Sequence, residues 1–172
     1  SGQGVYTVKI EAPQAPVVAS TTVNGRVGTA LAFKVSATAA NAVTYSLSGA
    51  PAGMGIGAST GAVSWATPVA GSYAVTVNAK DNVTGLVGKG VVTVVIAAAQ
   101  APVVASTTVN GRPGVALSFA ASVTAPNPVS WSLSGAPAGM SIGSTGVISW
   151  ASPVVGSYAV TVIAKDSKTG LT

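Results

Sequence analysis

The fold is indicated by one stretch of the chain, Gly71-Ser-Tyr-Ala-Val-Thr-Val-Asn-Ala-Lys-Asp81. Apolar side chains occupy every second position from Tyr73 to Ala79, which is the pattern of a β-strand with one buried face. The stretch returns as Gly156–Asp166 with one change, Ile163 in place of Asn78. Turn signals such as Asn-Gly and Thr-Gly separate further alternating segments, and no segment shows a helical period. The sequence therefore predicts an all-β protein.

The chain is a tandem repeat, and this stretch belongs to each of its two copies. Residues 14–57 align with residues 100–143, residues 59–86 align with residues 144–171, and about three quarters of the aligned residues are identical. Short strands with regular turn signals in each repeat predict two tandem immunoglobulin-like β-sandwiches. We expect a shared core signature of one Trp and one Tyr in each repeat: Trp65 and Tyr73, then Trp150 and Tyr158.

The two ends of the chain are out of phase with the repeats. Residues 2–12 resemble residues 88–98, which form the end of the first repeat, and the second repeat contains no counterpart of residues 91–96. This predicts three parts: residues 1–12 as a terminal strand that matches the last strand of a repeat, residues 13–99 as the first sandwich, and residues 100–172 as a second sandwich lacking its last strand.

Composition excludes most enzyme chemistry. The chain has no His, no Cys, three acidic residues and eight basic ones, with a net charge of +5. Catalytic triads, thiol chemistry and zinc sites need residues that are absent, and a calcium cage needs several converging carboxylates. The basic residues are scattered rather than gathered with aromatics, so nucleic acid is not an expected partner. No apolar stretch reaches the length of a membrane-spanning helix. We expect no enzyme activity, no metal and no cofactor.

One spaced pattern resembles a known family. It consists of Tyr45-Ser-Leu-Ser-Gly-Ala-Pro-Ala-Gly-Met54, then Ser59-Thr-Gly-Ala-Val-Ser-Trp65, then Gly71–Asp81, and it recurs in the second repeat from Trp131. This pattern is similar to the bacterial putative-Ig domains, which are related to dystroglycan-type cadherin-like repeats. The resemblance implies an extracellular or cell-surface protein, often an adhesin with many copies of the domain, and it carries over no catalytic residue. Cadherins bind calcium at acidic junctions, whereas the junction from Ile96 to Pro102 contains no acid.

The phase of the ends predicts how copies join. The N-terminal strand, Gly4–Ala12, would complete the second sandwich of the next chain or repeat by donor-strand complementation. The expected donor residues are Val5, Tyr6, Thr7, Val8, Lys9 and Ile10, with Tyr6, Val8 and Ile10 facing inward. The expected acceptor edge is Tyr158, Val160, Val162 and Ala164.

Two functional interpretations stay open at this stage. In the first, the chain is a structural protein of an extracellular fibre, filament or adhesin stalk, and its partners are copies of itself or adjacent repeats. In the second, it is a non-catalytic ligand-binding or spacer module of a secreted enzyme or surface protein. A longer repeat array that supplies the same strand in cis is an alternative to donor exchange. No host or surface ligand can be named from the sequence.

Overall fold

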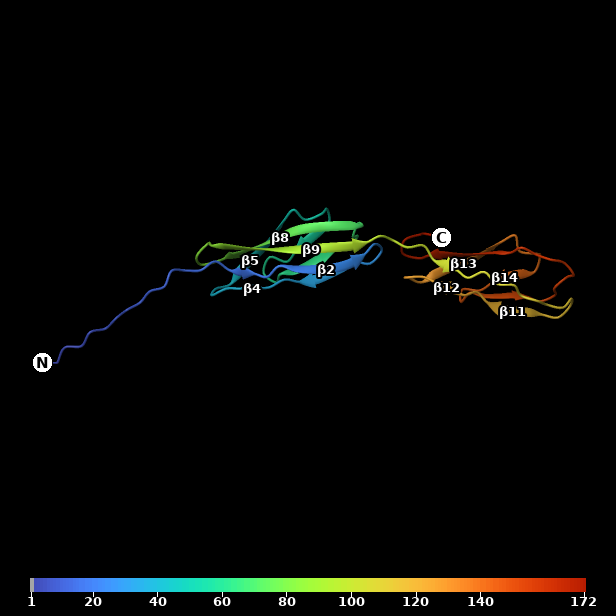
Figure 1. Ribbon diagram of the computed structural model, residues 1–172, viewed down its shortest axis with the longest axis horizontal. Coiled ribbons are helices and arrows are strands. Elements are labelled where there is room, and N and C mark those ends of the chain that lie inside the picture. The colour runs from blue at the N-terminus through green and yellow to red at the C-terminus, as the bar shows by residue number, and fades with distance from the viewer. Residues whose placement is uncertain (1) are drawn as a thin grey trace. The chain divides into compact units, whose positions relative to one another are not determined.

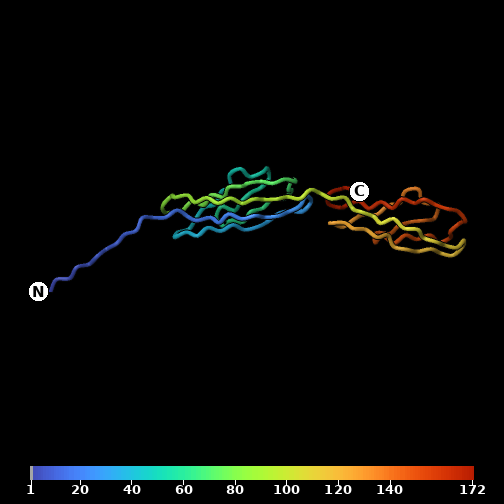
Figure 2. The backbone as a smooth tube through the Cα atoms, in the orientation of Figure 1, coloured from blue at the N-terminus to red at the C-terminus, as the bar shows by residue number. Residues whose placement is uncertain are grey.

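The computed structural model describes residues 2–172, and Ser1, the first residue of the expected terminal strand, lies outside the described residues. The chain divides into two compact units, Ser1–Ala97 and Ala98–Thr172. Within each unit the backbone doubles back repeatedly through strands and turns (Figure 2). The described residues contain strands and turns and no helix, which confirms the expected all-β class.

Unit 1 contains one four-stranded sheet, one three-stranded sheet and a short two-stranded pair. Its strands are β1 (Val17–Val18), β2 (Thr21–Arg26), β3 (Leu31–Lys34), β4 (Ala37–Thr38), β5 (Val43–Ser48), β6 (Met54–Ile56), β7 (Ala62–Trp65), β8 (Gly71–Asp81) and β9 (Val87–Ala97). The four-stranded sheet has the order β2-β9-β8-β5, and the three-stranded sheet has the order β3-β7-β6. β9 is thus an interior strand that lies between β2 and β8 (Figure 1).

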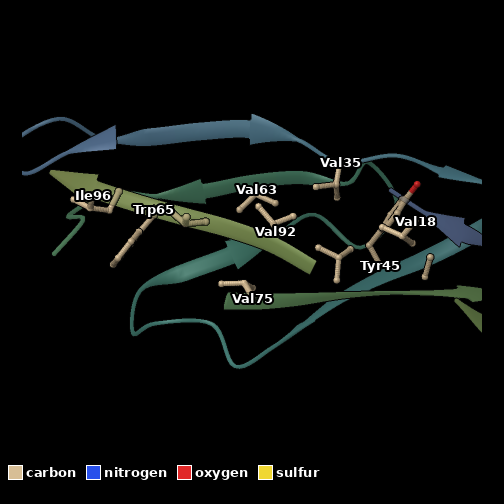
Figure 3. Packing of buried hydrophobic residues seen from close by; sticks show 11 residues of the cluster. Val18, Val35, Tyr45, Val63, Trp65, Val75, Val92 and Ile96 are labelled. Atoms are coloured by element: carbon tan, nitrogen blue, oxygen red, sulfur yellow. The ribbon is translucent and has the colours of Figure 1, made fainter. Parts of the chain in front are cut away.

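The core of unit 1 lies between these two sheets. Alternate residues of β7, β8 and β9 point into it, as the period of two predicts. The buried side chains form a row that runs from Ile96 and Trp65 through Val63 and Val92 to Val35, Tyr45 and Val18 (Figure 3). β9 supplies three of the buried members, Val92, Val94 and Ile96. A large share of the core therefore depends on the last strand of the unit.

Unit 2 repeats this architecture with fewer strands, of which only β16 is shorter than its counterpart, β8. These are β10 (Val103–Val104), β11 (Leu117–Ala120), β12 (Val123–Thr124), β13 (Val129–Ser134), β14 (Met140–Ile142), β15 (Val147–Trp150) and β16 (Thr161–Asp166). The three-stranded sheet β11-β15-β14 reproduces β3-β7-β6, but the sheet that has four strands in unit 1 is reduced to the pair β13-β16.

The N-terminal segment belongs to no sheet in the chain. Residues 2–16 form no strand, and β1 begins at Val17. The boundary between the two units falls between Ala97 and Ala98 in the sequence, two residues before the boundary expected after residue 99. β9 ends at Ala97, so the end of that strand sets the observed boundary.

Candidate functional site

In unit 1, β9 holds two neighbouring strands in place. It pairs parallel with β2 along Thr21–Arg26 and antiparallel with β8 along Gly71–Lys80. The other neighbour of β8, β5, reaches only as far as Thr76. Residues 71–75 of β8 and the whole of β2 therefore depend on β9 for their backbone partners.

The same two stretches of unit 2 have lost their strand structure. Residues 156–160 and residues 107–112 carry no strand, although residues 107–112 are identical in sequence to β2. Within residues 98–172, nothing aligns with the part of β9 that pairs with them. A segment becomes a strand only when a neighbouring backbone offers it hydrogen-bond partners. The local sequence of these stretches is therefore not sufficient to make them strands. In unit 1, β9 lies between the two equivalent stretches, and we call the corresponding position in unit 2 the acceptor slot.

The expected acceptor edge is placed along one side of this slot. Val162 and Ala164 lie in β16, whereas Tyr158 and Val160 come before the strand begins. Tyr158 is 42% exposed. Val160 and Val162 are only partly buried, whereas their counterparts in unit 1, Val75 and Val77, are almost completely buried. The slot thus leaves apolar side chains in solvent that the complete sandwich covers.

The other side of the slot was not foreseen from the sequence. The expected acceptor was a single sheet edge, but β9 has a neighbour on each side, so the missing strand would be an interior one. The second flank is residues 107–112, which lie beside a hollow of about 300 Å³ lined by Asn110, Gly111, Arg112, Val115, Ala116 and Leu117. The exact identity of residues 14–26 and 100–112 was the sequence signal that could have revealed it.

In unit 1 the corresponding place is filled by Ile96. A Cβ atom built on Gly25 would lie 2.8 Å from Ile96 Cδ1 and 3.3 Å from Leu31 Cδ1. A Cβ on Gly111, the counterpart of Gly25, would meet only the Leu117 side chain, at 3.5 Å. The hollow in unit 2 therefore corresponds to the position of an isoleucine side chain.

The predicted donor residues are exposed in the chain. Val5, Tyr6, Val8 and Ile10 are each at least 80% exposed. The Lys9 ammonium donates a hydrogen bond to Glu11 Oε1 at 2.9 Å on the surface. Such a row of large apolar side chains in solvent is unfavourable and marks a segment that can be buried by a partner.

Two glycines strengthen the match between this segment and β9. A Cβ on Gly88 would lie 1.7 Å from the Pro16 carbonyl oxygen, and a Cβ on Gly90 would lie 2.5 Å from that of Val18. Only glycine fits against the Pro16 and Val18 carbonyl groups at these two places. The N-terminal segment has glycine at both matching positions, Gly2 and Gly4, although nothing lies within 4 Å of a Cβ built there.

The expected core signature forms one aromatic pair in each unit. Trp65 and Tyr73 have ring centroids 5.2 Å apart at an interplanar angle of 87°, and Trp150 and Tyr158 repeat this at 5.2 Å and 88°. Trp65 is 1% exposed and Trp150 is 6% exposed. The indole N–H of each donates to a loop carbonyl, that of Ala52 or Ala138. The tryptophans are buried in both units, and the tyrosines lie at the rim.

Two buried carboxylates hold turns. Asp81 Oδ1 accepts the backbone N–H of Val83 at 2.8 Å and of Thr84 at 2.9 Å, and the Asn41 side chain donates to the same carboxylate. The Thr84 N–H, opposed by burial and helped by Asn41, holds the pKa of Asp81 below its ordinary 3.8.

Asp166 repeats this arrangement in unit 2. Asn127 Nδ2 donates to Asp166 Oδ2 at 3.0 Å, and the N–H groups of Lys168 and Thr169 donate to Oδ1. The Asn127 hydrogen bond is the largest cause of the lowered pKa of Asp166, followed by that of the Thr169 N–H. Each carboxylate is satisfied by protein donors. Among residues 2–172 no three His, Cys, Asp or Glu side chains gather where a metal ion would need them.

The pattern of the putative Ig domain family matches the chain twice, over residues 13–97 and residues 93–172. The chain belongs to the putative Ig domain family. The expected resemblance is thereby confirmed, as are two tandem immunoglobulin-like sandwiches. Tandem Ig-like domains are typical of adhesion and surface proteins, and Ig-like families are generally non-catalytic.

Solved structures provide distant neighbours of these putative Ig domains. A chimeric titin is 14% identical, with 90% of this chain and 97% of that chain covered and a TM-score of 0.47. Drosophila N-cadherin is 15% identical, with 90% and 46% covered and a TM-score of 0.43. A putative alpha-galactosidase from Bacteroides fragilis is 20% identical, with 52% and 19% covered and a TM-score of 0.44. This chain spans about a fifth of the length of that galactosidase chain. No curated protein matches in sequence. In the part of the chain that the structure describes, no helix has the length and apolarity to cross a membrane.

Proposed function

We propose that this chain is a structural protein of an extracellular fibre, filament or adhesin stalk, in which the N-terminal segment of one copy fills the acceptor slot of another. The proposal rests on two complementary features of one chain. The sheet of unit 2 contains no strand at the place that β9 holds in unit 1, and residues 2–12 are identical to residues 88–98 at seven of eleven positions.

The inward positions of the donor suit the slot. Tyr6, Val8 and Ile10 align with Val92, Val94 and Ile96, each of which is at most 3% exposed in unit 1. Full burial of a side chain of this kind stabilises by about 1.5–3 kcal/mol. The outward positions also agree, because Val5 aligns with Val91, which is 41% exposed.

The backbone of the donor would gain partners on both sides. On one flank it pairs antiparallel with residues 156–160 and β16, and on the other it pairs parallel with residues 107–112, as β9 does with β8 and β2. Gly2 and Gly4 would pass under Pro102 and Val104, the counterparts of Pro16 and Val18. This is strand addition to a sheet, with main-chain hydrogen bonds providing affinity and alternate side chains providing specificity.

A cis supply of the strand is the alternative within the same architecture. The turn after β16 has the same hydrogen bonds as the turn between β8 and β9: Asp166 N–H donates to the Leu171 carbonyl at 2.8 Å, as Asp81 does to Leu86. In a longer array, sequence following Thr172 could enter the slot directly. The 172-residue chain separates the two possibilities, because in it only residues 2–12 are available as a donor.

The first prediction concerns self-association of this chain. The 172-residue chain should form concentration-dependent polymers, and a variant lacking residues 1–12 should remain a monomer with a less stable unit 2. Sedimentation velocity measures the size distribution, and negative-stain microscopy shows whether filaments form.

A matched pair of substitutions controls for a general effect of the segment. Val8→Asp places a charge at a buried position of the donor and should abolish polymers, whereas Val5→Asp changes an outward position and should not. Filaments that persist without residues 1–12 would rule out donor exchange. Complete chains that stay monomeric at all concentrations would favour the other interpretation, a non-catalytic ligand-binding or spacer module of a secreted enzyme or surface protein.

A further inference from the structure

The slot has a charged end that is matched by the donor segment. In unit 1, the last pair of the β2–β9 ladder joins Arg26 to Ala97. Both residues lie on the outer, exposed face of the sheet, next to the inward pair of Gly25 and Ile96. The residue that follows the last buried position of β9 is therefore held beside an arginine.

The donor segment replaces that alanine with the single glutamate of the chain. Glu11 aligns with Ala97, and Arg112 aligns with Arg26. If residues 2–12 occupy the slot in the register of β9, Glu11 lies directly opposite Arg112. Opposite charges at facing positions of neighbouring strands attract, and like charges there repel.

The hollow gives evidence for the place of the residue before Glu11 that does not depend on charge. It is lined by Gly111, Arg112 and Leu117, and in unit 1 the equivalent place is taken by the Ile96 side chain. Ile10 aligns with Ile96 and precedes Glu11. The hollow and the arginine thus receive two successive donor residues, one pointing inward and the next pointing outward.

We infer that Ile10 and Glu11 form the register-determining end of the donor strand, with Ile10 in the hollow beside Gly111 and Leu117 and Glu11 paired with Arg112 of a second copy of this chain. This inference rests on the proposed function, since it assigns the partner and the register of the same slot. A slip of one residue would turn Ile10 outward and remove Glu11 from Arg112, so the two contacts select one register.

Charge reversal tests the pair in the complete chain. Glu11→Arg and Arg112→Glu should each weaken association about threefold to tenfold, since each places like charges opposite one another. The double variant restores an opposite pair and should associate like the unaltered chain. An equimolar mixture of the two single variants should also assemble, because each tail then meets an oppositely charged slot on the other variant.

The mixture identifies the partner as a second copy, since a tail bound within its own chain gains nothing from mixing. Arg26→Glu is the matched control: Arg26 faces Ala97 in the complete unit 1, so its reversal should leave association unchanged. Sedimentation velocity at low salt measures each sample, and the single-variant effects should shrink as ionic strength rises.

Each negative result would overturn a different part of the inference. If the single variants polymerise as well as the unaltered chain, the Glu11–Arg112 pair is wrong while donor exchange stands. If the double variant recovers and the mixture does not, the pair forms within one chain, and the second copy as partner is overturned. If the unaltered chain never associates, the proposed function itself fails.

Discussion

Asp81 and Asp166 show how single side chains stabilise turns in this charge-poor protein. Both are 1% exposed, and each accepts two backbone N–H groups two and three residues ahead together with an asparagine amide about forty residues behind. These turns lead out of β8 and β16, and the turn after β8 leads directly into β9.

These two carboxylates should make the protein sensitive to acid. Because the folded pKa of each is lowered, their contribution to stability is complete above the unfolded value near 3.8 and is lost as the pH falls through the lower folded value. The free energy of unfolding should therefore decline below about pH 4. Urea unfolding between pH 6 and pH 2, on the variant without residues 1–12, measures this.

Substitution identifies the groups responsible. Asp81→Asn and Asp166→Asn should each be less stable at neutral pH and should each flatten part of the acid dependence. A stability that does not change between pH 5 and pH 2 in the unsubstituted protein would contradict the role assigned to these side chains. Alternation in sequence predicted the buried tryptophans but not this role, because it depends on Asn41 and Asn127 far away in the chain.

At the scale of elements, identical sequences have different structures in the two units. Thr21–Arg26 forms β2, and the identical residues 107–112 form no strand. Strand positions and the repeat could be predicted because alternation and turn residues are local signals. The lengths of the strands could not, since a strand exists only where a neighbouring backbone completes its ladder.

Hydrogen exchange should show this difference amide by amide. In the variant lacking residues 1–12, residues 71–75 should be protected by β9, while residues 156–160 and 107–112 should exchange rapidly. Adding a synthetic peptide of residues 2–12 should protect both stretches of unit 2 together. Protection on the β16 side alone would mean that the peptide binds to a single edge rather than inside the slot.

Across the whole molecule, the two units differ in one sheet, which has four strands in unit 1 and two in unit 2. The likeness of residues 2–12 to residues 88–98 is visible in the sequence alone. The two-sided slot and the hollow beside Arg112 were not readable, because they depend on which strands become neighbours across the sheet.

Unfolding of the variant without residues 1–12 should therefore occur in two steps. Unit 2 should unfold first, since it lacks the buried side chains that β9 supplies to unit 1. The peptide of residues 2–12 should raise the free energy of unfolding of unit 2 alone, by about 2.7 kcal/mol when its free concentration is a hundred times its Kd. Only the lower of the two transition temperatures should therefore rise. Calorimetry over a range of peptide concentrations measures the shift. A single transition whose temperature does not change when the peptide is added would contradict this prediction.

The interior place of β9 has a consequence for how long the proposed joint between copies would last. A strand held at one edge can be peeled away from a single ladder, whereas a strand between two neighbours must leave both ladders and the core at once. Separation is then governed by a high barrier, and the lifetime of the joint is a matter of rate rather than of affinity. Force applied along such a strand acts in shear on all of its hydrogen bonds at the same time. If copies join as proposed, their filaments should therefore survive dilution and mechanical tension long after the free copies around them have been washed away.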